Sequence, residues 1–209
     1  MNELLTKKKY WDTIYREKST IDLGWFQEVP TISLDLIKAT GIEKDARIID
    51  VGGGDSFLVD HLLALGYSNI TVLDLSESAI ERAKERLGSK GSIVNWICSD
   101  ICDFNTDEKF DIWHDRACFH FLIDNADIQV YVSKVNQFLA EKGTFILGTF
   151  SETGPEKCSG LAIKQYTSAT ITEKFTQDFY VKKSIEATHI TPSMARQNYV
   201  FCRLKRITK

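Results

Sequence analysis

Three consecutive glycines, followed at a characteristic distance by an acid, are the residues best suited to hold a cofactor. Gly52, Gly53 and Gly54 come directly after an apolar run that begins at Ile48. Glycine permits positive φ and has no Cβ, so backbone N–H groups can approach a ligand closely. Asp74 ends the next apolar run, about 20 residues past the glycines, where an acid that binds the two hydroxyls of a ribose is expected. The spacing predicts a site for a nucleotide-type cofactor.

Two cofactors, NAD and S-adenosylmethionine (SAM), fit these residues, and position 57 helps to separate them. A dinucleotide site needs a third glycine there, because the helix must lie close to the strand beside the pyrophosphate. The chain has Phe57 instead, which argues against a pyrophosphate. SAM has one positive charge at its amine and another at its sulfonium, and an acid-rich turn complements both. The residues therefore favour SAM.

The segment Asp50-Val51-Gly52-Gly53-Gly54 resembles motif I, acid-x-Gly-x-Gly, of the class I SAM-dependent methyltransferases. The resemblance implies that Asp50 lies near the methionyl ammonium, that the glycines pass beneath the cofactor and that Asp74 binds the ribose. It also implies that Asp100 hydrogen-bonds the adenine amino group and that the N–H of Ile101 meets a ring nitrogen. An Asx-type turn is the structural alternative at Asp100. The full set of expected cofactor-binding residues is Asp50, Gly52, Gly53, Gly54, Asp74, Leu75, Ser99, Asp100, Ile101, His114 and Trp25.

The stretch Phe110–Phe121 occupies the place of motif IV, which in this family faces the methyl group and its acceptor. Its Trp-His-Asp-Arg is similar to the Trp-Asp-Arg of the thiopurine and tellurite-resistance methyltransferase branch, whose acceptors are small and soft. Asp115 and Arg116 are expected to orient the acceptor or close the cofactor pocket. His120 is the candidate base, since an imidazole titrates near neutrality. The alternative is an Asp-Arg ion pair with a histidine that only packs.

Aromatic residues near the N-terminus are expected to form a lid, because a sulfonium is attracted to an aromatic face and the transfer needs water excluded. These residues are Tyr10, Trp11, Tyr15, Trp25 and Phe26. An N-terminal tryptophan segment covers the cofactor in the thiopurine-like branch, and we assign that role to Trp25. For Trp11, packing of the first helix onto the sheet explains the residue equally well.

The segment Ser151–Leu161 follows the fifth expected strand, where related enzymes place a substrate-facing loop that often contains Gly-Pro-Pro. This chain has Gly154-Pro155-Glu156 there, which weakens the case for thiopurine or tellurite as the acceptor. Cys158 and Ser159, together with His189 from the C-terminal part, are candidate acceptor contacts. A solvated loop would look the same in sequence.

Composition and charge limit the classes of protein to which this chain can belong. The 209 residues, of which 43% are hydrophobic, allow one domain with a substantial core. The net charge of −3 and the dispersed basic residues exclude the basic patch of a nucleic-acid binder. No apolar run reaches the about 20 residues that span a bilayer, and the start lacks a signal peptide, so we expect a cytoplasmic protein with reduced cysteines. The spacing of the histidines and cysteines fits no metal site.

Apolar periodicity predicts alternating strands and helices, and hence an α/β, Rossmann-like, doubly wound sheet of seven strands. The sheet is expected to be mostly parallel, with an antiparallel C-terminal hairpin strand like that of class I methyltransferases. The expected strands are 48–51, 70–74, 92–98, 110–114, 144–150, 180–188 and 199–206, and the expected helices are 10–18, 30–40, 56–65, 78–87, 128–139 and 169–179. We expect a single domain over 1–209, with a helical lid in 1–44, a SAM-binding core in 45–150, and a substrate loop and hairpin in 151–209.

These features predict a SAM-dependent methyltransferase that acts on a small-molecule acceptor through S, Se or Te, N or O. Transfer would be in line, with positioning supplying most of the acceleration. Three alternatives stay open: a protein lysine methyltransferase, an NAD-dependent oxidoreductase and a non-catalytic SAM-binding protein. Nucleic acid and membrane are not expected partners, and the oligomeric state cannot be read from the sequence.

Overall fold

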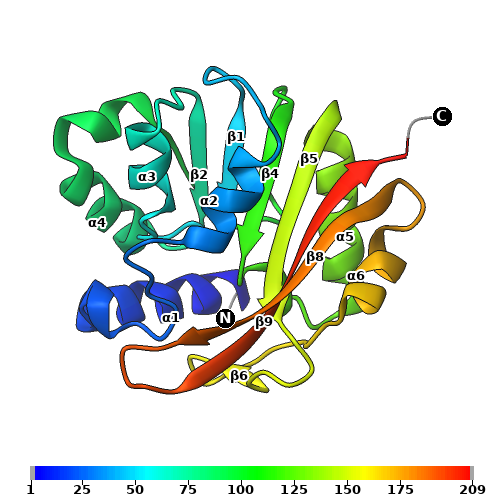
Figure 1. Ribbon diagram of the computed structural model, residues 1–209. Helices are drawn as coiled ribbons and strands as arrows, with labels where there is room; N and C mark the ends of the chain where they lie inside the picture. Colours follow the sequence, from blue (N-terminus) through cyan, green and yellow to red (C-terminus); the bar gives the residue numbers. More distant parts are fainter. Residues whose placement is uncertain (1–2, 208–209) are drawn as a thin grey trace.

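The computed structural model describes residues 3–207 and contains one large sheet of seven strands (Figure 1). Its strands are β1 (Ile48–Val51), β2 (Ile70–Asp74), β3 (Asn95–Cys98), β4 (Phe110–Arg116), β5 (Leu139–Phe150), β8 (Phe179–Ile190) and β9 (Arg196–Arg206). Their order is β3-β2-β1-β4-β5-β9-β8; β1 to β5 are parallel, and β9 lies antiparallel between β5 and β8. The predicted α/β fold with a mostly parallel sheet and an antiparallel C-terminal strand is confirmed.

Helices cover both faces of the sheet. They are α1 (Glu3–Glu17), α2 (Thr31–Lys38), α3 (Leu58–Ala64), α4 (Glu77–Leu87), α5 (Asn125–Phe138) and α6 (Ser168–Phe175). Successive residues of a strand point to opposite faces. Accordingly Ile49 and Trp113 pack with α5 and α6, whereas Ile48 and Ile112 pack with α2 and α3. No helix within residues 3–207 has the length and apolarity to cross a bilayer.

Strand register gathers the chemically important residues at one edge of the sheet. Asp50 of β1 is paired with His114 of β4, and Asp74 of β2 is paired with Cys98 of β3. These positions are the carboxyl ends of parallel strands, and the strand order reverses between β1 and β4. Ligands of doubly wound sheets bind at such a reversal.

Several element boundaries differ from the prediction. The first helix begins at Glu3, seven residues before its predicted start at position 10. A 3-10 turn, η2 (Gly88–Ile93), precedes β3, which is therefore shorter than predicted, and a short hairpin of β6 (Lys157–Cys158) and β7 (Leu161–Ala162) was not predicted. The last helix ends at Phe175, because the buried Phe179 already pairs with β9.

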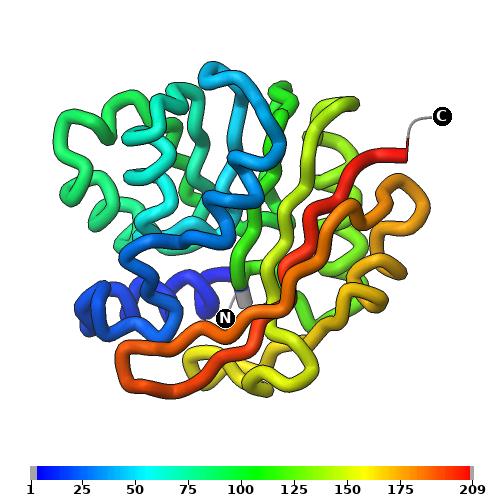
Figure 2. The backbone as a smooth tube through the Cα atoms, in the orientation of Figure 1, coloured from blue at the N-terminus to red at the C-terminus, as the bar shows by residue number. Residues whose placement is uncertain are grey.

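The N-terminal segment lies against the carboxyl edge of the sheet, where α1 is held below the strand ends (Figure 1). Asp12 accepts hydrogen bonds from Ser76 Oγ (2.7 Å) and Ser78 N (3.1 Å) at the start of α4. The β8–β9 hairpin reaches the same region in Figure 2, and His189 Nε2 lies 3.0 Å from the carbonyl oxygen of Gly24. Segments from both ends of the chain therefore meet at this edge.

Arg82 of α4 ties this N-terminal segment to the glycine turn. It donates hydrogen bonds to the carbonyls of Tyr15 (2.6 Å) and Lys18 (2.9 Å), and it forms an ion pair with the buried Asp55 (3.2 Å). Asp55 also accepts a hydrogen bond from Thr20 Oγ1 (2.7 Å). These contacts join α1, α4 and the turn that follows the glycines.

We expect Arg82→Met to lower the free energy of unfolding by about 2 kcal/mol, since it leaves Asp55 buried without its cation and Arg82 itself is only partly buried. Urea unfolding monitored by tryptophan fluorescence measures the change. Lys84→Met is the matched control on the same helix, because the Lys84–Glu81 pair is exposed. Equal losses in the two variants would show that the ties between Arg82 and the N-terminal segment do not stabilise the fold.

Candidate active site

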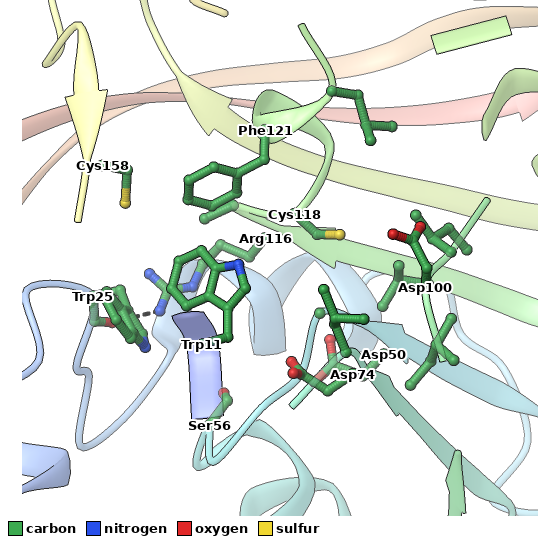
Figure 3. A pocket seen from close by; sticks show the side chains of 18 of the residues that line it. Trp11, Trp25, Asp50, Ser56, Asp74, Asp100, Arg116, Cys118, Phe121 and Cys158 are labelled. Atoms are coloured by element: carbon green, nitrogen blue, oxygen red, sulfur yellow. Dashed lines mark hydrogen bonds between the residues drawn. The ribbon is translucent and has the colours of Figure 1, made fainter. Parts of the chain in front are cut away.

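A cavity of about 340 Å³ opens where β1, β2 and β4 end, and its volume lies in the range typical of small-molecule sites. Most of the residues expected from the sequence line it, and Figure 3 shows several of them. They are Asp50, Gly52, Gly53, Asp74, Leu75, Ser99, Asp100, Ile101, His114, Trp25 and Arg116. Three of the expected cofactor-binding and catalytic residues, Gly54, Asp115 and His120, are not among its lining.

The glycine turn is tight, and side chains would not fit on it. Gly52 has φ +66°, and a Cβ there would lie 2.5 Å from Cβ of Cys118. A Cβ on Gly53 would lie 2.7 Å from Oδ2 of Asp50. Gly54, with φ +52°, has a different neighbour, because its Cβ would lie 2.6 Å from the Tyr15 hydroxyl. The absence of side chains at Gly52 and Gly53 therefore lets the turn pack tightly at the cavity. The absence of a side chain at Gly54 leaves room for Tyr15 of the N-terminal segment.

Asp50 belongs to a buried hydrogen-bonded chain. Its Oδ1 lies 2.7 Å from Nδ1 of His114, and His114 Nε2 lies 2.8 Å from Oγ of Ser33. Both ring nitrogens of His114 are thus occupied within the protein. The imidazole lines the cavity and also fixes the orientation of the Asp50 carboxylate.

Asp74 lies buried at the end of β2. Its Oδ1 accepts a hydrogen bond from Ser76 N (2.7 Å). Burial, with a smaller contribution from the neighbouring Asp50 and Asp55, raises the pKa of Asp74 to about 7 against the opposing backbone hydrogen bonds. Ligand groups that donate hydrogen bonds to this carboxylate would favour its ionised form.

Asp100 forms the Asx-type turn and also lines the cavity. Its Oδ1 accepts a hydrogen bond from Cys102 N (2.9 Å), as in an Asx-type turn. The residue also lines the cavity, next to Ser99 and Ile101. The Asx-type turn and a place in the cavity lining are therefore compatible at Asp100.

Asp115 faces the protein interior. Its carboxylate accepts hydrogen bonds from Cys118 N (3.0 Å), Phe119 N (3.1 Å) and the Tyr131 hydroxyl (2.7 Å), and burial raises its pKa to about 6. It thereby holds the 3-10 turn η3 (Phe119–Phe121) that follows β4. Within residues 3–207 there is no Asp115–Arg116 ion pair. The ion pair considered as an alternative to a role of these two residues in the site is therefore not formed.

His120 is fully buried and packs between the rings of Phe121 and Phe150. Its Nδ1 lies 3.4 Å from the N–H of Phe150. Burial lowers the pKa of His120 to about 3, with a smaller contribution from Arg116. These surroundings match a packing histidine better than a base that meets the acceptor.

The Tyr131 hydroxyl offers a test of the structural role of Asp115. It donates to Asp115 and accepts from Trp113 Nε1 (3.1 Å). We expect Tyr131→Phe to lower the free energy of unfolding by about 1–3 kcal/mol, because two buried polar groups lose a partner. Urea unfolding checks this, with Tyr180→Phe on the exposed face of β8 as a control that should change little. An unchanged midpoint for Tyr131→Phe would contradict this role.

Aromatic side chains form the other end of the cavity. Trp11 contacts Trp25 and Phe121, with ring centroids 5.9 and 5.1 Å apart (Figure 3). The β6–β7 hairpin adds Cys158 and Leu161 to the lining. The lining includes the predicted lid residues Trp11, Tyr15 and Trp25 and the predicted acceptor contact Cys158. Ser159 and His189 do not line it.

Sequence reasoning missed Cys118, Phe121 and Leu161 as lining residues. Cys118 and Phe121 lie inside the motif IV stretch, so the position of that stretch could have indicated that both residues lie near the site. Leu161 lies on a hairpin too short to leave a periodic pattern. Burial raises the pKa of Cys118 well above its ordinary value, so this thiol stays protonated beside the glycine turn.

Comparisons with known proteins agree with this geometry. Residues 48–143 match the family described as a methyltransferase domain. The human protein "EEF1A lysine methyltransferase 2" is 28% identical over 167 residues, which cover 73% of this chain and 71% of that protein. Nodulation protein S of Rhizobium tropici is 24% identical over 128 residues, 61% of this chain and 53% of that one.

Solved structures show the same fold. The N-methyltransferase NodS from Bradyrhizobium japonicum, in complex with S-adenosyl-L-homocysteine (SAH), matches with a TM-score of 0.73 and 17% identity, covering 95% of this chain and 99% of that one. A SAM-dependent methyltransferase from Anabaena variabilis matches with a TM-score of 0.74 and 14% identity, covering 99% and 96%. The alternatives of an NAD-dependent oxidoreductase and a non-catalytic protein are thereby set aside. Residues 48–143 match a methyltransferase domain, and the chain is a SAM-dependent methyltransferase.

Proposed function

We propose that the cavity binds SAM along its acidic side and a small-molecule acceptor between its aromatic walls. Asp74 would accept the ribose hydroxyls, Asp100 and Ile101 would meet the adenine, and Asp50 would face the methionyl ammonium above Gly52 and Gly53. One observation supports this most: a single cavity has buried acids on one side and Trp11, Trp25 and Phe121 on the other. The acids complement both cations of SAM.

SAM, when bound, supplies the electrophile: an electron pair of the acceptor forms a bond to the methyl carbon while the carbon–sulfur bond breaks, leaving SAH. The residues of the chain position the acceptor and exclude water. Positioning of this kind is worth about 7–11 kcal/mol. His120 lies outside the cavity lining, so the acceptor must be nucleophilic without it, as a thiolate is. Soft acceptors like those of the thiopurine and tellurite-resistance branch meet this condition.

Calorimetric titration with SAM, SAH and NAD tests the cofactor assignment. We expect SAM and SAH to bind and NAD to give no heat above dilution. Transfer is then measured with methyl-labelled SAM and a set of small thiols, selenols, amines and carboxylates. Binding of NAD alone would overturn the proposal.

A protein lysine as acceptor is the second candidate, and the relatives named EEF1A lysine methyltransferase favour it. Incubation with labelled SAM and a fractionated cell extract separates the two. The small-molecule proposal predicts a labelled small product that separates from SAM by chromatography, and the lysine candidate predicts label on protein.

A further inference from the structure

Arg116 is the last residue of β4, and its guanidinium lines the cavity. Its Nη2 donates to the carbonyl oxygen of Trp25 (2.5 Å), and the group lies 5.9 Å from the centre of the Tyr199 ring. Its Nη1 is buried and has no hydrogen-bond partner. A buried donor without a partner is costly, and more so when it carries charge. The guanidinium is therefore held in place through Nη2, and its Nη1 forms no hydrogen bond within the protein.

Arg116 lies apart from the labelled acids of the cavity, whose lining also includes Lys7, Asp124 and Asp127. Figure 3 shows Arg116 beside Trp25 and Cys158, whereas Asp50, Asp74 and Asp100 lie apart from it. In the described part of the chain no carboxylate forms an ion pair with Arg116. The pKa values agree with this arrangement: Asp50 and Asp55 raise the pKa of Asp74, whereas Arg116 acts against burial on the pKa of Cys158. The end of the cavity next to Cys158 thus has a cation without a counterion.

We propose that Arg116 binds a carboxylate of the acceptor, so that this methyltransferase acts on small organic acids; the inference rests on the proposed function. A guanidinium binds a carboxylate through two parallel hydrogen bonds, and Nη1 has no hydrogen-bond partner within the protein that a carboxylate would have to displace. The apolar walls formed by Trp11 and Phe121 would hold the carbon skeleton of such an acid. The same cation repels an ammonium group, which disfavours an amine or a lysine side chain at this position.

A carboxylate at Arg116 has two possible sources, because SAM itself carries one. The carboxylate of SAM is attached to the same carbon as its ammonium group. The proposed function places that ammonium beside Asp50, which lies apart from the guanidinium in Figure 3. We therefore assign the carboxylate at Arg116 to the acceptor.

Thermal shift of the SAH-saturated protein tests the acceptor assignment with matched probes: benzoate, phenylacetate and 3-mercaptopropionate, each with its amide and its amine analogue. We expect at least one acid to raise the melting temperature and to bind about 10-fold or more tightly than its amide, the effect of one charge-assisted hydrogen bond. The amines should give no shift. Arg116→Gln should abolish the preference for the acid, Arg116→Lys should retain part of it, and the exposed Arg196→Gln should leave it unchanged. If no acid exceeds its amide, the inference is wrong.

Titration of Arg116→Gln with SAH and with 5′-methylthioadenosine, which lacks the amino-acid part, distinguishes the two sources. Unchanged affinity for both supports the acceptor assignment and shows that the variant is folded. A loss of affinity for SAH alone would assign Arg116 to the cofactor and overturn the inference. Failure of the wild-type protein to bind SAH would instead contradict the proposed function.

Discussion

Gly52→Ala should reduce SAH affinity by about 100-fold or more and lower the free energy of unfolding by several kcal/mol. Two effects combine at this residue. Its φ of +66° is unfavourable for any residue with a Cβ, and the added methyl group would lie 2.5 Å from Cβ of Cys118. Because that neighbour is fixed to the backbone, the strand ends must separate or the turn must move into the cavity. Calorimetric titration with SAH and urea unfolding measure the two losses.

Two further variants separate backbone strain from the steric clash. Gly66 also has positive φ (+89°), but its added Cβ would meet no atom within 4 Å. We expect Gly66→Ala to cost only about 1–2 kcal/mol of stability and to leave SAH affinity unchanged. In the double variant Gly52→Ala with Cys118→Gly the opposing Cβ is absent, and affinity should partly return. If Gly66→Ala weakened SAH binding as strongly as Gly52→Ala, the local clash would not be the cause.

The lining of the acidic side of the cavity, to which we assign the cofactor, could be predicted from sequence because it depends on short segments and strand ends. Gly52 and Gly53 follow β1, and Asp74 ends β2, so parallel pairing alone brings them together. The apolar runs define those strands without long-range information. The sequence did not predict the hydrogen bond between Asp50 and His114 (2.7 Å), which depends on the register between β1 and β4.

The acceptor side could not be predicted in the same way, because it depends on turns and on segments distant in the chain. After β4, Ala117 has φ +70°, and the following η3 turn directs His120 into the core instead of the cavity. The residue type of His120 suggested a base, but its surroundings lower its pKa to about 3. The strands of the β6–β7 hairpin have two residues each, which is too short for an alternation of apolar and polar residues to be recognised in the sequence.

Asp74→Asn should weaken SAH binding by about 100-fold at pH 8, because each hydrogen bond to a carboxylate is worth about 1.5–3 kcal/mol and a neutral amide forms weaker ones. Asparagine keeps the shape of the side chain, and its oxygen can still accept from Ser76 N. The loss therefore reports the charge and not a cavity. Asp45→Asn at an exposed position is the control and should bind SAH normally.

The pH dependence of the same variant provides a second readout. Ribose hydroxyls favour the ionised carboxylate, so SAH affinity of the wild-type protein should rise with pH up to about 7, the pKa of free Asp74, and then level off. The affinity of Asp74→Asn should not show this rise. A rise of the same size in the variant would mean that another group titrates.

The unliganded protein should respond in the opposite direction. The folded-state pKa of Asp74 lies above its ordinary value of 3.8, so its contribution to stability is complete below pH 3.8 and is lost as pH rises through about 7. Asparagine has no charge to bury, and Asp74→Asn should therefore stabilise the unliganded protein at pH 8 by on the order of 2 kcal/mol. Urea unfolding at pH 5 and pH 8 measures the difference, which should be larger at pH 8. A variant that lost both SAH affinity and stability at pH 8 would show that the carboxylate supports the fold, whereas lost affinity with gained stability shows that a destabilising buried charge is retained for the ligand.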